Sequence, residues 1–358
     1  MCIRDSIWSD RGFAGHDWLF CMLHNFGGNI GLYGRIPTLC GDLAEAEAKS
    51  TALKGIGLAP EGIETNPVVY ELMTELPWHD GPVDADKWIK DYASARYGKS
   101  TPAVDKAWQL LKNSVYNCPR GNTQQGTAES VFCARPSDNP RMASAWAQLS
   151  PYYDFDDVRT AAKLLAAEAP AFDGNTNYEY DLVDVVRQVV ADKGREVAAD
   201  FKAAAEAGNR EAYARHSRRF MQLIDMQDRL LATIPDFRLG TWIEKARNRG
   251  NDKAEQDLFE WNARVQITCW GGRVAADKGK LHDYAHREWQ GLLSDFYAPR
   301  WQKWFETRLA NWDKPDAAKI DFYRIEEPWT MKKNHYSSSP EGKPAEIAAD
   351  ILTSALAI

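Results

Sequence analysis

Short apolar runs alternate with amphipathic segments along the first 80 residues of the chain. Residues 18–23 form an unbroken apolar run, which predicts a buried strand, and the apolar run at residues 53–58 predicts a second one. Residues 43–53, rich in Ala and Glu, predict a helix between them, and another helix is expected at residues 67–76, with proline in its first turn. This order is typical of a parallel sheet or a (β/α)8 barrel, although two such units cannot close a barrel of eight strands.

Beyond residue 80 the pattern changes to long helical periodicities with almost no strand signal. Apolar side chains recur there at three- and four-residue spacing, as expected of helices with one buried face. The absence of a repeat with fixed period argues against a solenoid. The sequence therefore predicts a mainly α fold, with βα units in residues 1–80 and a large α-helical domain in residues 81–358. The expected helices are Asp84–Tyr97, Pro102–Val115, Tyr180–Phe201, Glu211–Ile234, Asp252–Trp270, His282–Ala310 and Ala345–Ala355, with a polar loop at Trp329–Pro344.

Composition narrows the classes of function. The net charge of −7 and the pI near 5.6, without a basic stripe, argue against nucleic acid as a partner. No apolar run approaches the ~18–20 residues of a membrane span, and residues 1–10 hold no apolar segment typical of a secretion signal. Aromatic residues make up 11% of the chain, including 14 Trp. Aromatic rings stack on the C–H faces of sugars, so this surplus favours a carbohydrate partner, although most of the rings are expected to fill the core.

The cysteines do not define a metal site, because no C-x-x-C pair or other zinc spacing is present. Cys118 and Cys133 flank a polar loop and could be bridged in an oxidising compartment, whereas isolated buried thiols are expected for the others. The six cysteines are Cys2, Cys21, Cys40, Cys118, Cys133 and Cys269.

Glu61 is the first candidate for chemistry. It lies in the segment GLAPEG at residues 57–62, just after a predicted strand, where a barrel enzyme places its catalytic groups. Gly62 lets the backbone turn, and Pro60 stiffens the approach, so that a carboxylate nucleophile can be held in place. The alternative is a glutamate that merely favours the N-terminus of a helix.

The segment CMLHNFGGN at residues 21–29 follows the other predicted strand. It offers two polar side chains, His24 and Asn25, and an aromatic wall, Phe26, although a lone histidine is more often structural. Its paired glycines also suggest a phosphate cradle, but neither G-x-x-x-x-G-K nor a complete G-x-G-x-x-G pattern follows.

A third cluster lies at residues 270–289. His282 and His286 are four residues apart, which places them on one face of the expected helix, but no third zinc ligand stands out and no metal is predicted. Trp270 and Tyr284 fit better as rings that line a sugar pocket, with core packing as the alternative.

Taken together, these blocks resemble the C-terminal half of the alpha-N-acetylglucosaminidases, glycoside hydrolase family 89. The similarity runs from about Trp8 to the C-terminus. Its most specific pieces are CMLHNFGGN at 21–29, APEGI with VVYELM at 59–73, SVYNC at 114–118, and DYA, WQGL and DFYAPRW within 283–301.

The resemblance implies a (β/α)8 barrel followed by an α-helical domain that walls the pocket, and cleavage of terminal alpha-linked N-acetylglucosamine with retention. It implies no cofactor, a glycan ending in N-acetylglucosamine as partner, and a secreted, periplasmic or lysosomal setting. It places the nucleophile at Glu61. The positions that the resemblance assigns to the sugar are Leu23 and Phe26, then Trp270, Leu281 and Tyr284 from the helical domain, with His24 and Asn25 matching the same motif.

The family's acid/base glutamate lies on an earlier barrel strand, in a segment that this chain does not contain. We therefore expect a fragment that holds the last βα units of a truncated (β/α)8 barrel and is inactive alone. Nothing in the sequence supports Glu64 or Asp17 as a replacement acid. The alternative is a non-catalytic carbohydrate-binding or helical interaction module, motivated by the aromatic surplus on a mostly helical chain.

Overall fold

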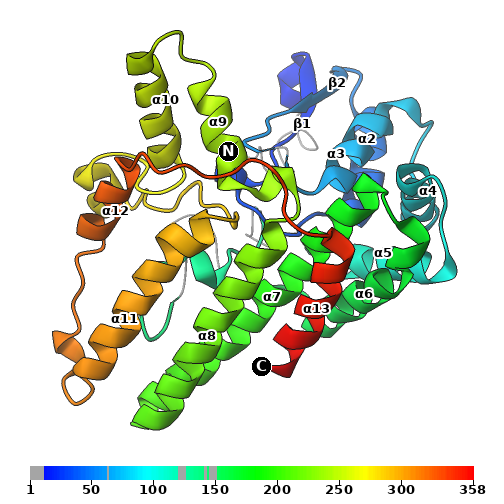
Figure 1. Ribbon diagram of the computed structural model, residues 1–358. Helices are drawn as coiled ribbons and strands as arrows, with labels where there is room; N and C mark the ends of the chain where they lie inside the picture. Colours follow the sequence, from blue (N-terminus) through cyan, green and yellow to red (C-terminus); the bar gives the residue numbers. More distant parts are fainter. Residues whose placement is uncertain (1–11, 63, 120–125, 141–142, 145–150) are drawn as a thin grey trace. The chain divides into compact units, whose positions relative to one another are not determined.

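The computed structural model of the 358-residue chain describes all residues except 1–11, 63, 120–125, 141–142 and 145–150 (Figure 1). The chain forms two compact units. Unit 1 comprises Met1–Thr127 and Tyr152–Asn177, and unit 2 comprises Ala128–Pro151 and Tyr178–Ile358. These units are defined by packing, and the domain boundary expected at residue 80 stays a prediction.

Unit 1 begins with the predicted βα pattern. Strands β1 (Trp18–Met22) and β2 (Leu53–Leu58) are parallel, and Met22 pairs with Leu58 at their carboxyl ends. Helix α2 (Ile36–Lys49) connects them, and α3 (Pro67–Glu75) follows β2. The positions of both strands and of α3 confirm the sequence prediction. The expected burial of the strands is wrong, because the described residues form a sheet of only two strands and no residue of either strand is fully buried. Helix α2 begins seven residues before the predicted start, because Pro37 occupies its first turn, where proline is tolerated, instead of ending the segment.

The rest of unit 1 is helical, with α4 (Ala85–Tyr97), α5 (Pro102–Asn113) and α6 (Phe155–Glu168). Side chains cap α4 and α5 as the sequence indicates. The Asp84 carboxylate accepts hydrogen bonds from the backbone N–H groups of Asp86 and Lys87, and the Thr101 hydroxyl accepts one from Val104. Helix α6 was not predicted, although Asp154 caps it in the same way.

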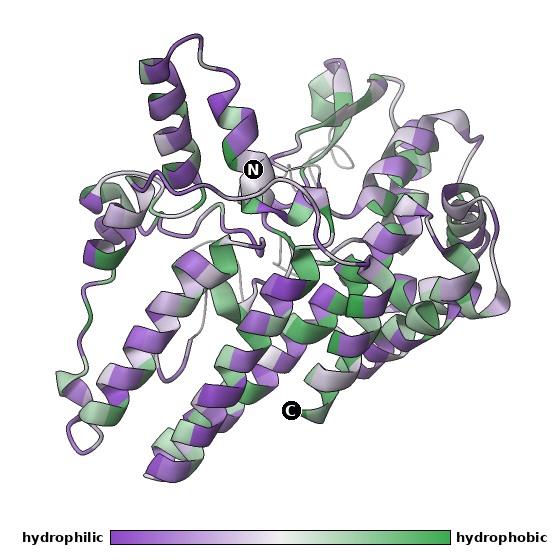
Figure 2. Cartoon of the chain, in the orientation of Figure 1, coloured by the Kyte–Doolittle hydropathy of each residue, from purple (hydrophilic) through white to green (hydrophobic). Residues whose placement is uncertain are grey.

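Unit 2 is a helical body built around α7 (Thr176–Glu206) and α8 (Arg210–Leu231), which run side by side (Figure 1). Helices α11 and α13 pack on α8. Both long helices carry a hydrophobic and a hydrophilic stripe (Figure 2), and the buried stripes meet in a cluster of rings that includes Phe201, Phe220 and Trp301. The remaining helices are α9 (Leu239–Arg247), α10 (Lys253–Gln266), α11 (Ala298–Ala310), α12 (Tyr323–Thr330) and α13 (Pro344–Ala357).

The helix predicted at His282–Ala310 is wrong over its first third. Residues 282–285 form a turn and residues 286–289 belong to no helix or strand, so that helical structure begins only at Leu292 and continues through a π-type turn into α11. The reason is local backbone geometry, because Asp283 (φ 56°) and Gly291 (φ 85°) both lie in the left-handed region, which an α-helix cannot include. The mainly α fold class with βα units at its start is confirmed. Among the described helices none is long and apolar enough to cross a bilayer.

Candidate active site

Two loops meet at the carboxyl edge of the β1–β2 pair. Because the strands are parallel and Met22 pairs with Leu58, the loop after β1 and the loop after β2 leave the sheet at the same edge. Glu61 lies three residues beyond β2, with its side chain exposed. This is the edge at which (β/α)8 enzymes carry their catalytic groups.

The loop after β1 donates a backbone hydrogen bond to Glu61. The N–H of Gly27 lies 2.5 Å from Oε2 of Glu61. Positive φ angles at Asn25 (54°), Gly27 (67°) and Gly28 (69°) turn this backbone toward the carboxylate. At Gly62 the two loops approach each other backbone to backbone, since a Cβ atom there would lie 2.7 Å from Cα of Gly28. Glycine at residue 62 is therefore required for this contact.

His24 and Asn25 belong to the loop after β1, and their side chains are almost fully buried. The Asn25 side-chain amide donates to Oγ1 of Thr65 at 2.7 Å, which ties the loop after β1 to the loop after β2. The His24 ring packs against the rings of Tyr33 and Tyr70 at centroid distances of 5.3 and 5.4 Å. Burial lowers the pKa of His24 to about 3, so the imidazole is neutral at physiological pH.

Leu23 and Phe26 are partly exposed on the same loop, on either side of the buried pair. The structure thus brings Leu23, Phe26 and Glu61 to one edge of unit 1, with His24 and Asn25 supporting them from inside.

Asn66 is a supporting residue that the sequence analysis missed. Its side chain donates to the carbonyl of Gly31 at 2.9 Å and accepts from the N–H of Tyr33 at 3.1 Å, so it holds the chain that follows the HNF loop. The only local signal is an Asn in front of the proline that starts α3. Tyr70 on α3 also escaped notice, although its hydroxyl donates to the carbonyl of Gly62 at 3.1 Å, beside Glu61.

Unit 2 brings the other three predicted residues together. The rings of Trp270 and Tyr284 meet edge to face, with centroids 4.9 Å apart, and Leu281 lies on the same turn as Tyr284. All three side chains are partly exposed. Trp270 has a φ of 63°, which ends the helical path of α10 four residues before the predicted end. A left-handed backbone is unusual for so bulky a residue and indicates a held conformation.

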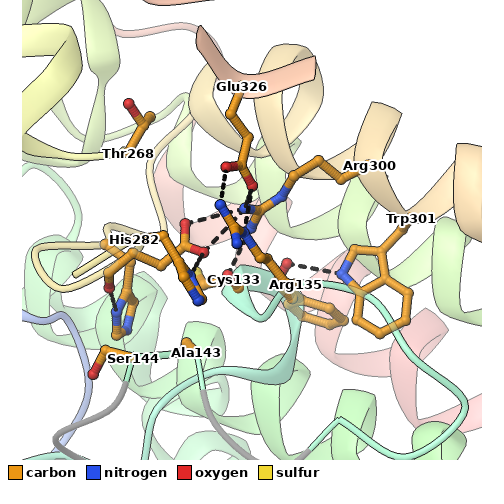
Figure 3. A network of polar contacts seen from close by, with 12 residues as sticks. Cys133, Arg135, Ala143, Ser144, Thr268, His282, Arg300, Trp301 and Glu326 are labelled. Carbon is orange, nitrogen blue, oxygen red and sulfur yellow. Dashed lines mark hydrogen bonds and ion pairs between the residues drawn. The ribbon is translucent and has the colours of Figure 1, made fainter. Parts of the chain in front are cut away.

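A network of buried charges underlies this turn (Figure 3). The Asp283 carboxylate accepts from Nη1 of Arg300 at 3.0 and 3.2 Å and lies 3.0 Å from Nδ1 of His282. Arg300 also donates to Glu326 at 2.7 Å. Burial alone would raise the pKa of Asp283, but the charge of Arg300 and the hydrogen bond from His282 outweigh it and hold this pKa at about 2.

The sequence predicted that His282 and His286 lie on one face of a helix. That prediction is wrong, because residues 282–285 form a turn. The Nδ1 atom of His286 lies 2.9 Å from the carbonyl oxygen of Asp283, so both rings are engaged within the turn. In the described part of the chain, no group of three or more His, Cys, Asp or Glu side chains is placed to hold a metal ion.

Cys118 and Cys133 are both buried free thiols, so the alternative of a bridge between them is wrong for this structure. Each has partners of its own. Cys118 lies near Arg35 and Tyr33, and the fully buried Cys133 lies near Tyr297 and Arg300. Burial raises the pKa of both thiols, which makes them poor nucleophiles at neutral pH.

A carboxylate at the carboxyl end of a parallel βα unit, in a chain with a large helical body, is typical of glycoside hydrolases of the (β/α)8-barrel class. Family comparison makes the assignment specific. The C-terminal domain of alpha-N-acetylglucosaminidase (NAGLU) matches residues 88–354, and the TIM-barrel domain of the same family matches residues 4–80. The chain therefore belongs to the alpha-N-acetylglucosaminidase family.

Individual relatives agree with this assignment. Human alpha-N-acetylglucosaminidase is 34% identical over 359 residues, covering 95% of this chain and 45% of the human protein. A family 89 glycoside hydrolase from Clostridium perfringens, solved in complex with PUGNAc, is 34% identical with a TM-score of 0.93, covering 97% of this chain and 40% of the bacterial one. The chain thus spans less than half the length of the relatives it matches.

The bacterial hydrolase has also been solved with other ligands. A variant with two glutamates changed to glutamine holds its substrate GlcNAc-alpha-1,4-galactose; it is 33% identical with a TM-score of 0.92 and has the same coverage, 97% and 40%. A further structure is in complex with 2-acetamido-1,2-dideoxynojirimycin.

Proposed function

We propose that this chain supplies the nucleophile, Glu61, and part of the sugar pocket of a retaining exo-alpha-N-acetylglucosaminidase. The observation that carries the proposal is the hydrogen bond of 2.5 Å from the N–H of Gly27 to the Glu61 carboxylate, at the carboxyl edge of a parallel βα pair. A backbone donor fixes the position of a carboxylate, and a nucleophile has to be held in place to attack. Membership of the family, whose solved bacterial member binds a GlcNAc-containing substrate, supports the same interpretation.

The chemistry needs a second carboxyl group. In a retaining mechanism the nucleophile attacks the anomeric carbon while a carboxylic acid, about 5–5.5 Å away, protonates the leaving oxygen. Water then hydrolyses the glycosyl-enzyme, with the second group acting as base. The resemblance places that acid/base glutamate on an earlier barrel strand, and the relatives extend well beyond the length of this chain. Of the two carboxyl groups, we therefore assign only the nucleophile to this chain.

The remaining site residues take binding and supporting roles. Leu23 and Phe26 offer apolar contact to the sugar and its acetyl group from unit 1. His24 and Asn25 hold their loop from behind, because both side chains are buried and Asn25 is committed to Thr65. In unit 2, we assign Trp270, Leu281 and Tyr284 to sugar contact, as the resemblance implies.

The test is Glu61→Gln in the natural gene product that contains this chain, assayed on an aryl alpha-N-acetylglucosaminide. We expect turnover to fall by several orders of magnitude, because the amide cannot attack while the shape of the loop is kept. The matched control is Glu64→Gln, three residues along the same loop, which should retain near-normal turnover. Near-normal turnover of the Glu61 variant would refute the assignment. Retention is checked separately by NMR, since a retaining enzyme releases the α anomer of N-acetylglucosamine first.

The non-catalytic binding module is the competing function. The fluorescence of the tryptophans, titrated with N-acetylglucosamine, distinguishes the two. Tight binding by the 358-residue chain, unchanged in the Glu61 variant, together with no hydrolysis by the natural gene product, would favour the module.

A further inference from the structure

The loop of residues 280–286 is held in a backbone conformation that its own residues disfavour. Lys280 and Asp283 have φ angles of 54° and 56°, in the left-handed region. Such residues cost free energy and persist only where the surroundings over-determine them. This is also the loop that carries Leu281 and Tyr284, two of the residues that we assign to the sugar.

Asp283 is the point at which the loop is fixed. Its N–H donates to the carbonyl of Thr268 at 2.7 Å, and its carbonyl accepts from the N–H of His286 at 3.2 Å. Its fully buried carboxylate accepts from Arg300 and lies beside Nδ1 of His282. The backbone and the side chain of Asp283 are thus all engaged, which leaves the loop little freedom.

Arg300 connects this point to the rest of unit 2. Its Nη2 atom donates to the carbonyl of Cys133 at 2.8 Å, and its Nη1 atom donates to Glu326 at 2.7 Å (Figure 3). Glu326 in turn accepts from Arg135 at 2.6 and 3.0 Å. Arg135 also donates to Asp277 at 2.9 Å, and Asp277 lies in the π-type turn that leads directly into the loop. One network of charges therefore fixes the loop at its centre, where Asp283, Arg300 and Glu326 are buried, and at its entry, where Arg135 and Asp277 are partly exposed.

Stability is a weak explanation for this network. Replacing a buried ion pair by apolar side chains is often neutral or stabilising, because the desolvation of the charges offsets their attraction. What directional charge pairs supply is a defined geometry, above all when an arginine is shared by several acceptors.

We propose that Asp283 and Arg300 are positioning residues of the sugar site: they set the placement of Leu281 and Tyr284 and so determine affinity for the terminal N-acetylglucosamine without touching it. This inference rests on the proposed function, since it gives the loop its purpose there. It predicts a specific kinetic signature, because a misplaced binding residue weakens binding while Glu61 itself is unchanged.

The kinetic test uses Arg300→Lys and Asp283→Asn in the natural gene product. We expect KM for an aryl alpha-N-acetylglucosaminide to rise by at least about tenfold in both, with kcat within about threefold of the parent. Affinity for 2-acetamido-1,2-dideoxynojirimycin should fall by a similar factor. The matched control is Arg264→Lys, an equally buried arginine whose partner Glu260 lies 2.9 Å away on the same helix, α10. This control should leave KM unchanged.

A second measurement separates this inference from the proposed function. Hydrogen exchange of the peptide covering residues 268–286, without any sugar, should be at least about tenfold faster in Asp283→Asn and Arg300→Lys than in Arg264→Lys. If the parent protein shows no turnover, the proposed function fails and the exchange rates alone decide whether the pair fixes the loop. The positioning role is overturned if KM and exchange are both unchanged in the two variants, or if Arg264→Lys alters them equally through general loss of stability.

Discussion

The histidine of the HNF loop illustrates how burial decides the role of a residue. His24 packs between two tyrosine rings and is only 3% exposed. Its low pKa keeps it neutral, so it cannot act as a proton donor to a glycosidic oxygen near neutral pH. Its neighbour Asn25 donates its amide to Thr65 and turns the backbone toward Glu61. In the proposed site, adjacent motif residues thus have different roles: the partly exposed ones contact the sugar and the buried ones fix the loop.

The buried state of His24 predicts a dependence of stability on pH. The pKa of His24 is about 3 in the folded protein and 6.5 in the unfolded chain, so between these values only the unfolded chain binds the extra proton. The free energy of unfolding therefore falls as the pH falls, by about 1.4 kcal/mol per pH unit, or about 2 kcal/mol from pH 7 to pH 5. From pH 7 to pH 5, the free energy of unfolding of His24→Gln should fall by about 2 kcal/mol less than that of the parent protein. Urea unfolding at both pH values measures this difference.

The control for this prediction is His16→Gln, at an exposed histidine of the same unit. It should keep the pH dependence of the parent protein. An unfolding free energy that falls equally in the parent and in His24→Gln would show that the ring takes up its proton without unfolding.

At the scale of elements, the sequence predicts the features that depend on residues close together in the chain. The apolar runs at residues 18–23 and 53–58 predict the positions of both strands, because a short apolar run is the local signal of a strand. Glu61 is a candidate on sequence alone, because it follows a strand within a glycine-rich segment. Asn66 was not, because its partners Gly31 and Tyr33 lie more than thirty residues away. The turn at residues 282–285 was missed for the same reason, since Arg300 and Thr268 impose it from outside the segment.

Helix α7 carries a glycine whose role lies in packing. A Cβ atom on Gly194 would lie 2.6 Å from two ring atoms of Phe132, and that ring is fully buried against Phe220 and cannot retreat freely. Gly194→Ala should therefore destabilise unit 2 by about 1–2 kcal/mol, because overpacking outweighs the better helix propensity of alanine. Urea unfolding of the purified chain measures this difference.

Gly41 in α2 provides the matched comparison. It also lies inside a helix, but a Cβ atom there would meet nothing within 4 Å. Gly41→Ala should stabilise the chain by about 1 kcal/mol through helix propensity alone. If both alanine variants proved stabilising, the proposed packing role of Gly194 would be wrong.

On the scale of the whole molecule, Glu61 belongs to unit 1 and Tyr284 belongs to unit 2. The βα pair of unit 1 also leaves Leu19 and Leu58 at 53% and 38% exposure. Apolar side chains on a two-stranded parallel sheet are normally covered by further strands and helices, as in a complete barrel. The relatives are more than twice as long as the segment that matches this chain.

These considerations predict that the 358-residue chain has no glycosidase activity of its own. A missing general acid costs about 10²–10⁴-fold in rate, and the proposed mechanism places that acid outside this chain. We therefore expect hydrolysis of an aryl alpha-N-acetylglucosaminide by the isolated chain to be at background, and Glu61→Gln to cause no further loss there. In the natural gene product the same substitution should abolish turnover. The decisive comparison covers four proteins: the isolated chain and the natural gene product, each with and without Glu61→Gln. Turnover by the isolated chain that disappears in its Glu61 variant would mean that the second carboxyl group lies within these residues. Glu64 and Asp17 would then be the first candidates to substitute.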